Sequence, residues 1–222
     1  GFNLSMQDLD IRGAGNLLGS EQSGFIADIG FETYHRILNE AVDELKSDEF
    51  SELFATNETG APDFFPGTGY VKDCQIETDF ELLFPGSYIP GSAERMMLYR
   101  ELDSISNNSQ LEKFKNSLVD RFGELPDEST GLLDVVRLRW LAVRMGMEKI
   151  VLKNEIMICY FPADQKSDYY NSETFGKILN FLRTNSKKCQ MKENGKLTLT
   201  FGKVTSAVEA VNLLREMDEC VA

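Results

Sequence analysis

Few residues in this chain of 222 amino acids have a type and spacing that could carry out chemistry. His35 is the only histidine, so any imidazole-based acid-base mechanism would have to use it. It lies in an acidic stretch, where we expect a surface or boundary position rather than a catalytic one. Gly13 and Gly15 could begin a dinucleotide-binding loop, but Leu18 occupies the third glycine position of that motif and no buried strand precedes it. We therefore expect no dinucleotide site.

The cysteines also lack a chemical motif. Cys74, Cys159, Cys189 and Cys220 are far apart in the sequence, and no CxxC pair exists that could bind zinc or undergo redox exchange. The sequence has neither a GxxxxGK[ST] phosphate loop nor a GxSxG nucleophile motif. We expect buried free thiols, and no catalytic activity in this chain.

The charge of the chain argues against one class of partner. It has 23 basic and 36 acidic residues and a net charge of -13 at pH 7. A surface this negative repels a polyanion, so tight binding of nucleic acid by this chain alone is disfavoured. No apolar run approaches the roughly 18 residues of a membrane span, and the first residues do not read as an export signal. We expect a cytoplasmic globular protein.

The hydrophobic pattern divides the chain into three regions. Residues 1–50 end in an amphipathic helix, predicted over 31–47 by apolar residues at helical spacing. Residues 51–70 contain glycines and prolines that break both helices and strands, which predicts a linker. Residues 71–222 are predicted to form a compact domain.

This domain is predicted to begin with an extended segment over 71–84, followed by three helices. These helices begin near Ser92, Ser109 and Pro126, and Ser92 is expected to cap the first of them. Gly123 is expected to end the second helix.

The last third of the domain alternates strands and helices. Residues 149–153 and 155–161 predict paired strands, and 173–184 predict a helix. A second hairpin turns at Asn194-Gly195, and a closing helix follows it. The apolar residues assigned to the inside of the helix over 173–184 are Phe175, Ile178, Leu179 and Leu182, and those that predict the closing helix are Val204, Val208, Val211 and Leu214. Helices followed by a ββαββα order predict an α+β fold.

Two long motifs resemble a known family. The first is DLDIRGAGNLLGSEQSGFIADIGFETY, residues 8–34, and the second is FPGSYIPGSAERMMLYREL with the later LVDRFGELPDESTGLLDVVRLRWLAVRMGMEKI. Both are similar, in this order, to the region that follows the helicase core of bacterial transcription-repair coupling factors. The first half of the first motif also resembles the branch-migration translocase RecG. The resemblance covers essentially the whole chain.

The resemblance implies that this chain is the C-terminal part of an ATP-driven translocase on double-stranded DNA. Members of the family recognise RNA polymerase stalled at a lesion, push it off the DNA and recruit the excision-repair protein UvrA. ATP and magnesium would belong to the helicase lobes of the complete protein. No cofactor and no membrane partner are therefore expected for this part of it.

The resemblance assigns residues 1–50 to a translocation motif, a helical hairpin that packs against a helicase lobe of the same protein. Arg12 and Gln22 match the residues that link ATP hydrolysis to movement, and Gly13 and Gly15 would allow the tight turns of the hairpin. Arginine suits this role because its rigid donors can bridge groups on two moving lobes. Without those lobes, we expect this region to be loosely held.

For residues 71–222 the resemblance implies autoinhibition, in which the domain docks on an N-terminal UvrB-like module and hides the surface that UvrA uses. The candidate contacts are Arg95, Tyr99 and Arg100 on the first helix, and Asp120 and Arg121 at the end of the second. For the last two residues, an ion pair with each other is an equally open interpretation. Two positions depart from the family pattern: Gly91, where an acidic helix cap is usual, and Ser117, where acidic residues are common.

Two alternative functions stay open. One is a freestanding protein-interaction module that works without a motor. The other is a small-molecule sensor, because ββαββα sheets often carry regulatory ligand sites. Fold analogy alone does not decide between these classes.

Overall fold

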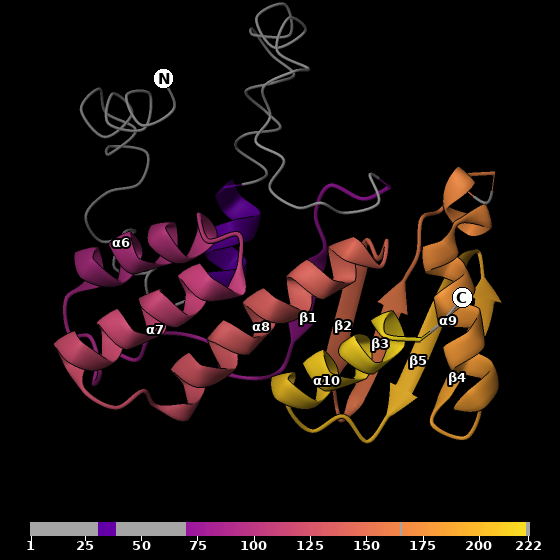
Figure 1. The fold of residues 1–222 in the computed structure, drawn as a ribbon. Coiled ribbons are helices and arrows are strands. Elements are labelled where there is room, and N and C mark those ends of the chain that lie inside the picture. The colour runs from indigo at the N-terminus through magenta and orange to yellow at the C-terminus, as the bar shows by residue number, and fades with distance from the viewer. Residues whose placement is uncertain (1–30, 39–69, 165, 221–222) are drawn as a thin grey trace, which may run out of the picture.

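A computed structural model of the chain describes residues 31–38, 70–164 and 166–220. These residues form one five-stranded sheet with helices packed on one face of it, and a further helical part at one end (Figure 1). The predicted α+β fold of the domain is confirmed. The predicted N-terminal hairpin lies outside the described residues.

The sheet has the order β1-β2-β3-β5-β4. Its strands are β1 (Gln75–Thr78), β2 (Lys149–Lys153), β3 (Ile156–Tyr160), β4 (Cys189–Asn194) and β5 (Lys196–Gly202). The strand β1 pairs in parallel with β2, and every other neighbouring pair is antiparallel. Both hairpins predicted from the sequence are confirmed.

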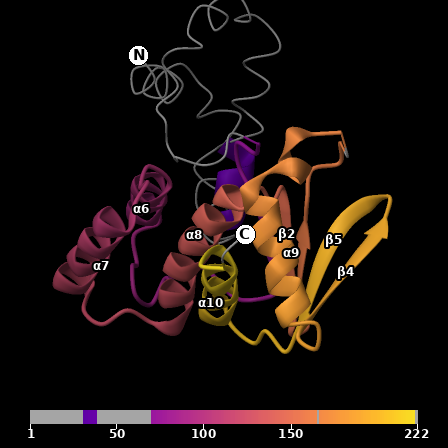
Figure 2. The same cartoon turned by 45° about the vertical axis from the view of Figure 1, so that its right-hand side comes forward.

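The helices follow the predicted order. They are α6 (Ser92–Asp103), α7 (Asn108–Phe122), α8 (Asp127–Arg144), α9 (Glu173–Thr184) and α10 (Ala207–Asp218), with a short 3-10 helix η1 (Asp168–Asn171) before α9. Figures 1 and 2 show α8, α9 and α10 over one face of the sheet, with α6 and α7 beyond α8. Residues 31–38 form a further helix, indigo in both views.

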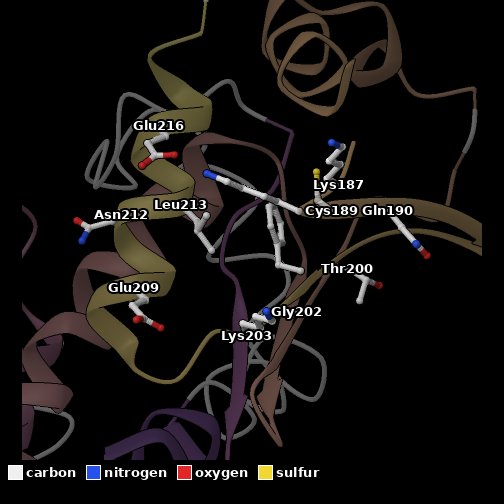
Figure 3. Close-up of a pocket in the computed structure, with 12 residues that line it drawn as sticks. Lys187, Cys189, Gln190, Thr200, Gly202, Lys203, Glu209, Asn212, Leu213 and Glu216 are labelled. Carbon is white, nitrogen blue, oxygen red and sulfur yellow. The ribbon is translucent and has the colours of Figure 1, made fainter. Parts of the chain in front are cut away.

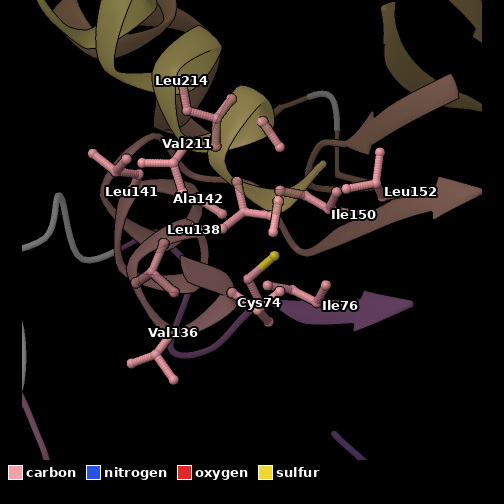
Figure 4. Packing of buried hydrophobic residues seen from close by; sticks show 14 of the residues in the cluster. Cys74, Ile76, Val136, Leu138, Leu141, Ala142, Ile150, Leu152, Val211 and Leu214 are labelled. Atoms are coloured by element: carbon pink, nitrogen blue, oxygen red, sulfur yellow. The ribbon is translucent and has the colours of Figure 1, made fainter. Parts of the chain in front are cut away.

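The core lies between α8, α10 and the sheet (Figure 4). Alternate residues of β1 and β2 point toward the helices, because successive side chains of a strand face opposite sides of the sheet. The fully or almost fully buried residues of this layer are Cys74, Ile76, Leu138, Ala142, Ile150, Leu152, Val211 and Leu214. This packing fixes α8, which carries Arg139 of the charged group described below.

Local signals explain most helix ends. The side chain of Asn107 caps α7 by accepting a hydrogen bond from the Gln110 backbone N–H at 2.9 Å. Gly123 ends α7 as predicted, with a φ of 90°. At the start of α6 the prediction is wrong by one residue: Gly91, not Ser92, is the N-cap, and no side chain caps this helix.

Two further expectations are corrected by the structure. Of the extended segment 71–84, only Gln75–Thr78 forms a strand. Leu179 was assigned to the inside of its helix, but it is 44% exposed. The expectation of free thiols holds, since all the described cysteines are free and all but the half-buried Cys220 are buried.

Candidate interaction surface

One tyrosine in the loop before α6 holds the end of α7. The Tyr88 hydroxyl donates to the backbone oxygens of Gly123, at 2.9 Å, and Leu118, at 3.3 Å. Its ring meets Phe122 edge to face, with the ring centroids 5.8 Å apart. These contacts fix the last turn of α7, and therefore the side chains that this turn presents to solvent.

On that last turn, Arg121 pairs with α6. Its guanidinium donates to the Glu94 carboxylate at 2.6 Å and lies 4.8 Å from the centroid of the Phe122 ring. The partner of Arg121 is therefore Glu94, and the ion pair with Asp120 that the sequence left open is not formed. Asp120 is exposed beside it. Because the Arg121–Glu94 pair is itself exposed, it orients the two side chains more than it stabilises the fold.

These groups define a mixed surface, called here the α6–α7 surface. It consists of Glu94, Met97, Ser117, Asp120 and Arg121. Residues three or four apart on a helix share a face, so two of these side chains lie together on α6 and three on α7. Met97 is 67% exposed, the highest exposed fraction among the large apolar side chains of the described residues. The surface thus combines one apolar group with both signs of charge, a composition suited to a protein contact.

Two predicted contact residues are not on this surface. Tyr99 is completely buried, and its hydroxyl accepts a hydrogen bond from the Phe84 backbone N–H at 3.1 Å. Arg95 is 5% exposed, and its guanidinium donates to the backbone oxygen of Ile89 at 2.8 Å. Both side chains hold the loop that precedes α6. In this conformation neither side chain is accessible to a partner.

Arg100 is exposed in the last turn of α6, three residues beyond Met97 of the α6–α7 surface. It is close to Tyr34 of the helix at residues 31–38. Burial raises the pKa of the Tyr34 hydroxyl, and the positive charge of Arg100 opposes that rise. Of the five predicted contact residues, Arg95 and Tyr99 are therefore buried, and Asp120 and Arg121 lie on the α6–α7 surface. Arg100 lies close to the helix at residues 31–38.

A second polar group was not predicted from the sequence, and it is called here the charged cluster. Its members are Glu32, His35, Asp73, Asp103 and Arg139. Arg139 of α8 is 6% exposed and donates to both oxygens of the Glu32 carboxylate at 2.7 Å. It also lies 3.8 Å from Asp73. The two negative neighbours raise the pKa of the Arg139 guanidinium although burial opposes this, so the group stays charged.

His35 bridges two carboxylates within the cluster. Its Nε2 lies 3.0 Å from Asp73, and its Nδ1 forms a hydrogen bond with Asp103. Burial alone would lower the pKa of the imidazole, but the bonds to Asp103 and Asp73 outweigh burial and raise that pKa to about 9. His35 is thus protonated at neutral pH. Its predicted boundary position is confirmed, because its side chain is 17% exposed.

The charged cluster had no signal in the sequence. Its contacts join residues 38, 68 and 107 positions apart. Helix spacing and turn motifs report only near neighbours, so no local pattern could have identified it.

A groove of about 650 Å³ lies between α10 and the β4–β5 hairpin (Figure 3). Phe201 and Leu213 provide apolar groups, and Lys187, Lys203 and Glu216 are among the charged residues that line it. Both signs of charge are present, so the groove does not select one ligand charge.

The predicted translocation residues Arg12, Gly13, Gly15 and Gln22 lie outside the described residues. Within the described ranges, no group of three or more His, Cys, Asp or Glu side chains could hold a metal ion. The same part of the chain contains no helix that is long and apolar enough to cross a membrane.

Comparison with known proteins identifies the class. Residues 78–172 match the family model of the TRCF domain. A crystal structure of the C-terminal domain of transcription-repair coupling factor superposes with a TM-score of 0.54 at 18% sequence identity, over 66% of this chain and 94% of that one. The helices α6, α7 and α8 and the strands β2 and β3 therefore lie within the residues that match the TRCF domain.

Sequence relatives give the particular family. The chain is 33% identical over 199 residues to the transcription-repair-coupling factor of Rickettsia prowazekii, and 39% identical over 150 residues to that of Escherichia coli. These matches include 89% and 68% of this chain, but only 16% and 12% of the two relatives. This chain is related to the transcription-repair coupling factors and corresponds to their C-terminal region, as the sequence motifs predicted.

Proposed function

We propose that this chain is the C-terminal region of a transcription-repair coupling factor, and that it acts by binding other protein surfaces rather than by catalysis. The observation that carries this proposal is the similarity to the Rickettsia prowazekii factor over 89% of the chain. The complete protein would use ATP and magnesium to move on double-stranded DNA. It would remove stalled RNA polymerase and then recruit UvrA.

Within that protein, residues 71–222 would regulate UvrA recruitment. The α6–α7 surface would dock on the N-terminal UvrB-like module and hide the surface that UvrA needs. Met97 offers an exposed apolar contact, and Asp120 and Arg121 offer charges that can orient the partner. The pairing of Arg121 with Glu94 supports this role, because it presents the arginine in one orientation before any partner binds.

Residues 1–50 would couple ATP hydrolysis to movement through Arg12 and Gln22. The support for this part is the sequence resemblance alone. Replacing Arg12 in the complete protein should abolish displacement of polymerase while leaving ATP binding intact, which a displacement assay and a nucleotide-binding assay can separate.

Calorimetric titration tests the regulatory role. The 222-residue chain is titrated with the UvrB-like module of the same protein, and the titration is repeated with Asp120→Ala and Arg121→Ala. Each substitution is expected to weaken binding by about tenfold, which is the effect of a central contact worth about 1.4 kcal/mol. Lys166→Ala is the matched control, since Lys166 is exposed on the loop that follows β3.

Equal binding by all four proteins would place the contact elsewhere on the domain. If binding is too weak to detect, a chain that joins the two partners covalently is tested, because a linker supplies roughly millimolar effective concentration. Unhindered UvrA binding by that joined chain would refute the regulatory role. The small-molecule alternative is tested by a thermal-shift screen, in which a hit should lose its effect when Leu213 in the groove is changed to Asp.

A further inference from the structure

Residues 31–38 belong to the amphipathic helix that the sequence placed in the translocation region, yet they pack into the C-terminal domain. Phe31 is 1% exposed and Tyr34 is 7% exposed. The centroids of their rings lie 5.9 and 6.1 Å from that of Tyr99 on α6. The helix therefore covers Tyr99 on one side, while Phe84 stacks on it with the centroids 5.1 Å apart.

The charged cluster joins the same helix to three separate elements. Glu32 is bound by Arg139 of α8, and His35 is bound by Asp103 at the end of α6 and by Asp73 before β1. In addition, the Arg139 guanidinium lies 5.5 Å from the centroid of the Phe31 ring. The aromatic and the charged contacts are thus parts of one interface.

We propose that residues 31–38 form a detachable strap, which the charged cluster locks over Tyr99 and Arg139 and whose release uncovers this side of the domain. The proposal concerns contacts inside this chain, and it does not depend on the proposed docking of the α6–α7 surface.

The strap can be released because its attachment depends on buried charges that must all be paired. A buried ion pair contributes little net stability when it is complete, but removing one partner is costly because the other stays buried and uncompensated. Glu32 and His35 are the strap's contributions to this balance, and Asp73, Asp103 and Arg139 are the domain's. The strap therefore holds firmly while all five groups are charged, and it loosens when any one of them is neutralised.

The position of the strap in the sequence suits it to connect the translocation region with the domain. Phe31 directly follows residues 1–30, which carry Arg12 and Gln22. A displacement of that region acts on Phe31 through the covalent chain, so movement on one side of the strap can change what the other side exposes. The strap thus offers a mechanical link between the two parts of the chain.

The dependence on pH has a defined sign. Among the described residues, the charged or titratable groups around His35 include Glu32 and Arg36 on its own helix, Asp73 before β1, Asp103 on α6 and Arg139 on α8. Because the pKa of His35 is raised from 6.5 to about 9, its contribution to docking is complete below pH 6.5 and is lost as the pH rises through 9. The pKa of Asp73 is lowered by His35 and Arg139 in spite of burial, so its contribution is lost only in acid.

The presence of one histidine makes a direct test possible. The full 222-residue chain is labelled with ¹³C-histidine, and the single imidazole signal is followed by NMR between pH 5 and 11. The expected midpoint is near 9, and Asp103→Asn should move it by at least about one unit toward the ordinary value of about 6.5. A midpoint near that ordinary value in the unchanged chain would refute the proposal.

Hydrogen exchange at constant pH provides the second measurement. Asp103→Asn and Glu32→Gln should each reduce protection in residues 31–38 by at least about tenfold, the change that corresponds to one pKa unit. Protection of β3 should stay unchanged. Asp218→Asn is the matched control, because it removes an ion pair with Arg144 that lies outside the strap.

If residues 31–38 exchange without protection in the unchanged chain, the strap is not docked and the proposal fails. It also fails if the variants leave that protection as it was. No UvrB-like module is present in either experiment, so failure here leaves the proposed regulatory function untouched. If a variant also unfolds β3, the histidine titration of the unchanged chain still decides the question.

Discussion

Gly146 offers a sharp test of how α8 ends. Its φ is 73°, and the backbone N–H groups of Gly146 and Met147 donate to the oxygens of Val143 and Ala142. This pattern is the Schellman motif, in which glycine is strongly preferred. A Cβ at this position would lie 2.3 Å from Cε2 of the Tyr169 ring.

The Tyr169 ring cannot move away from a Cβ placed at Gly146. It is fully buried, it packs near Phe161 with the ring centroids 6.1 Å apart, and its hydroxyl donates to the Met145 backbone oxygen at 2.7 Å. Gly146→Ala therefore meets two penalties. The left-handed backbone costs roughly 1–2 kcal/mol, and overpacking costs roughly 1–3 kcal/mol. We expect the free energy of unfolding to fall by about 2–5 kcal/mol in total.

Gly195→Ala is the matched control. Gly195 has a nearly identical φ of 76°, but a Cβ there would meet no atom within 4 Å. Only the backbone penalty of roughly 1–2 kcal/mol applies. Urea unfolding of both variants, followed by circular dichroism, should show the larger loss for Gly146→Ala at an unchanged slope. Equal losses would refute the claim that the Tyr169 ring is fixed.

Three further predictions follow from burial and charge. Gly91→Ser should raise the free energy of unfolding by about 0.5–1 kcal/mol, because it supplies the missing cap of α6 and restricts the unfolded chain; a lower melting temperature would contradict this. In native protein, a thiol reagent should modify the half-buried Cys220 before Cys159, whose pKa is raised by burial; equal rates would contradict this. Arg139→Met should cost about 3–5 kcal/mol in urea unfolding, because it leaves Glu32 uncompensated; Arg139→Met combined with Glu32→Gln should recover part of the loss, and no recovery would contradict the pairing.

Much of the fold could be predicted because its signals are local. Asn194-Gly195 favours a tight turn between strands, and this hairpin forms with Gly195 at positive φ. Gly123 and Pro126 likewise mark the end of α7 and the start of α8. Each of these signals depends on the backbone preferences of one or two residues, so no distant partner is needed to interpret it.

Helix faces were predicted less well, because apolar residues can occur on more than one face. On α6 the buried positions are Arg95, Leu98, Tyr99 and Leu102, which follow helical spacing. Their spacing could have shown that Arg95 shares a face with two leucines, but its charge favoured a surface assignment. In the structure Arg95 is buried with its guanidinium hydrogen-bonded to the backbone oxygens of Ile89 and Pro90.

The charged cluster could not be predicted from the sequence. Its groups are contributed by the helix at residues 31–38, the segment before β1, α6 and α8, and only the tertiary fold brings these elements together. A single histidine in an acidic stretch predicts a surface or boundary position, but it does not predict which carboxylates the imidazole will meet. Two carboxylates from distant segments make His35 a structural cation.

Burial of Tyr99 also changes how tests of the interface must be interpreted. Tyr99→Phe removes the hydroxyl that accepts from the Phe84 N–H, so it should lower stability by about 1 kcal/mol and leave the affinity of the folded domain for a partner unchanged. Arg121→Ala should lower the affinity for a partner and leave stability almost unchanged, because its pair with Glu94 is exposed and contributes little to folding. A loss of binding by Tyr99→Phe without a loss of stability would mean that Tyr99 is uncovered in the binding state, which requires the strap to have moved.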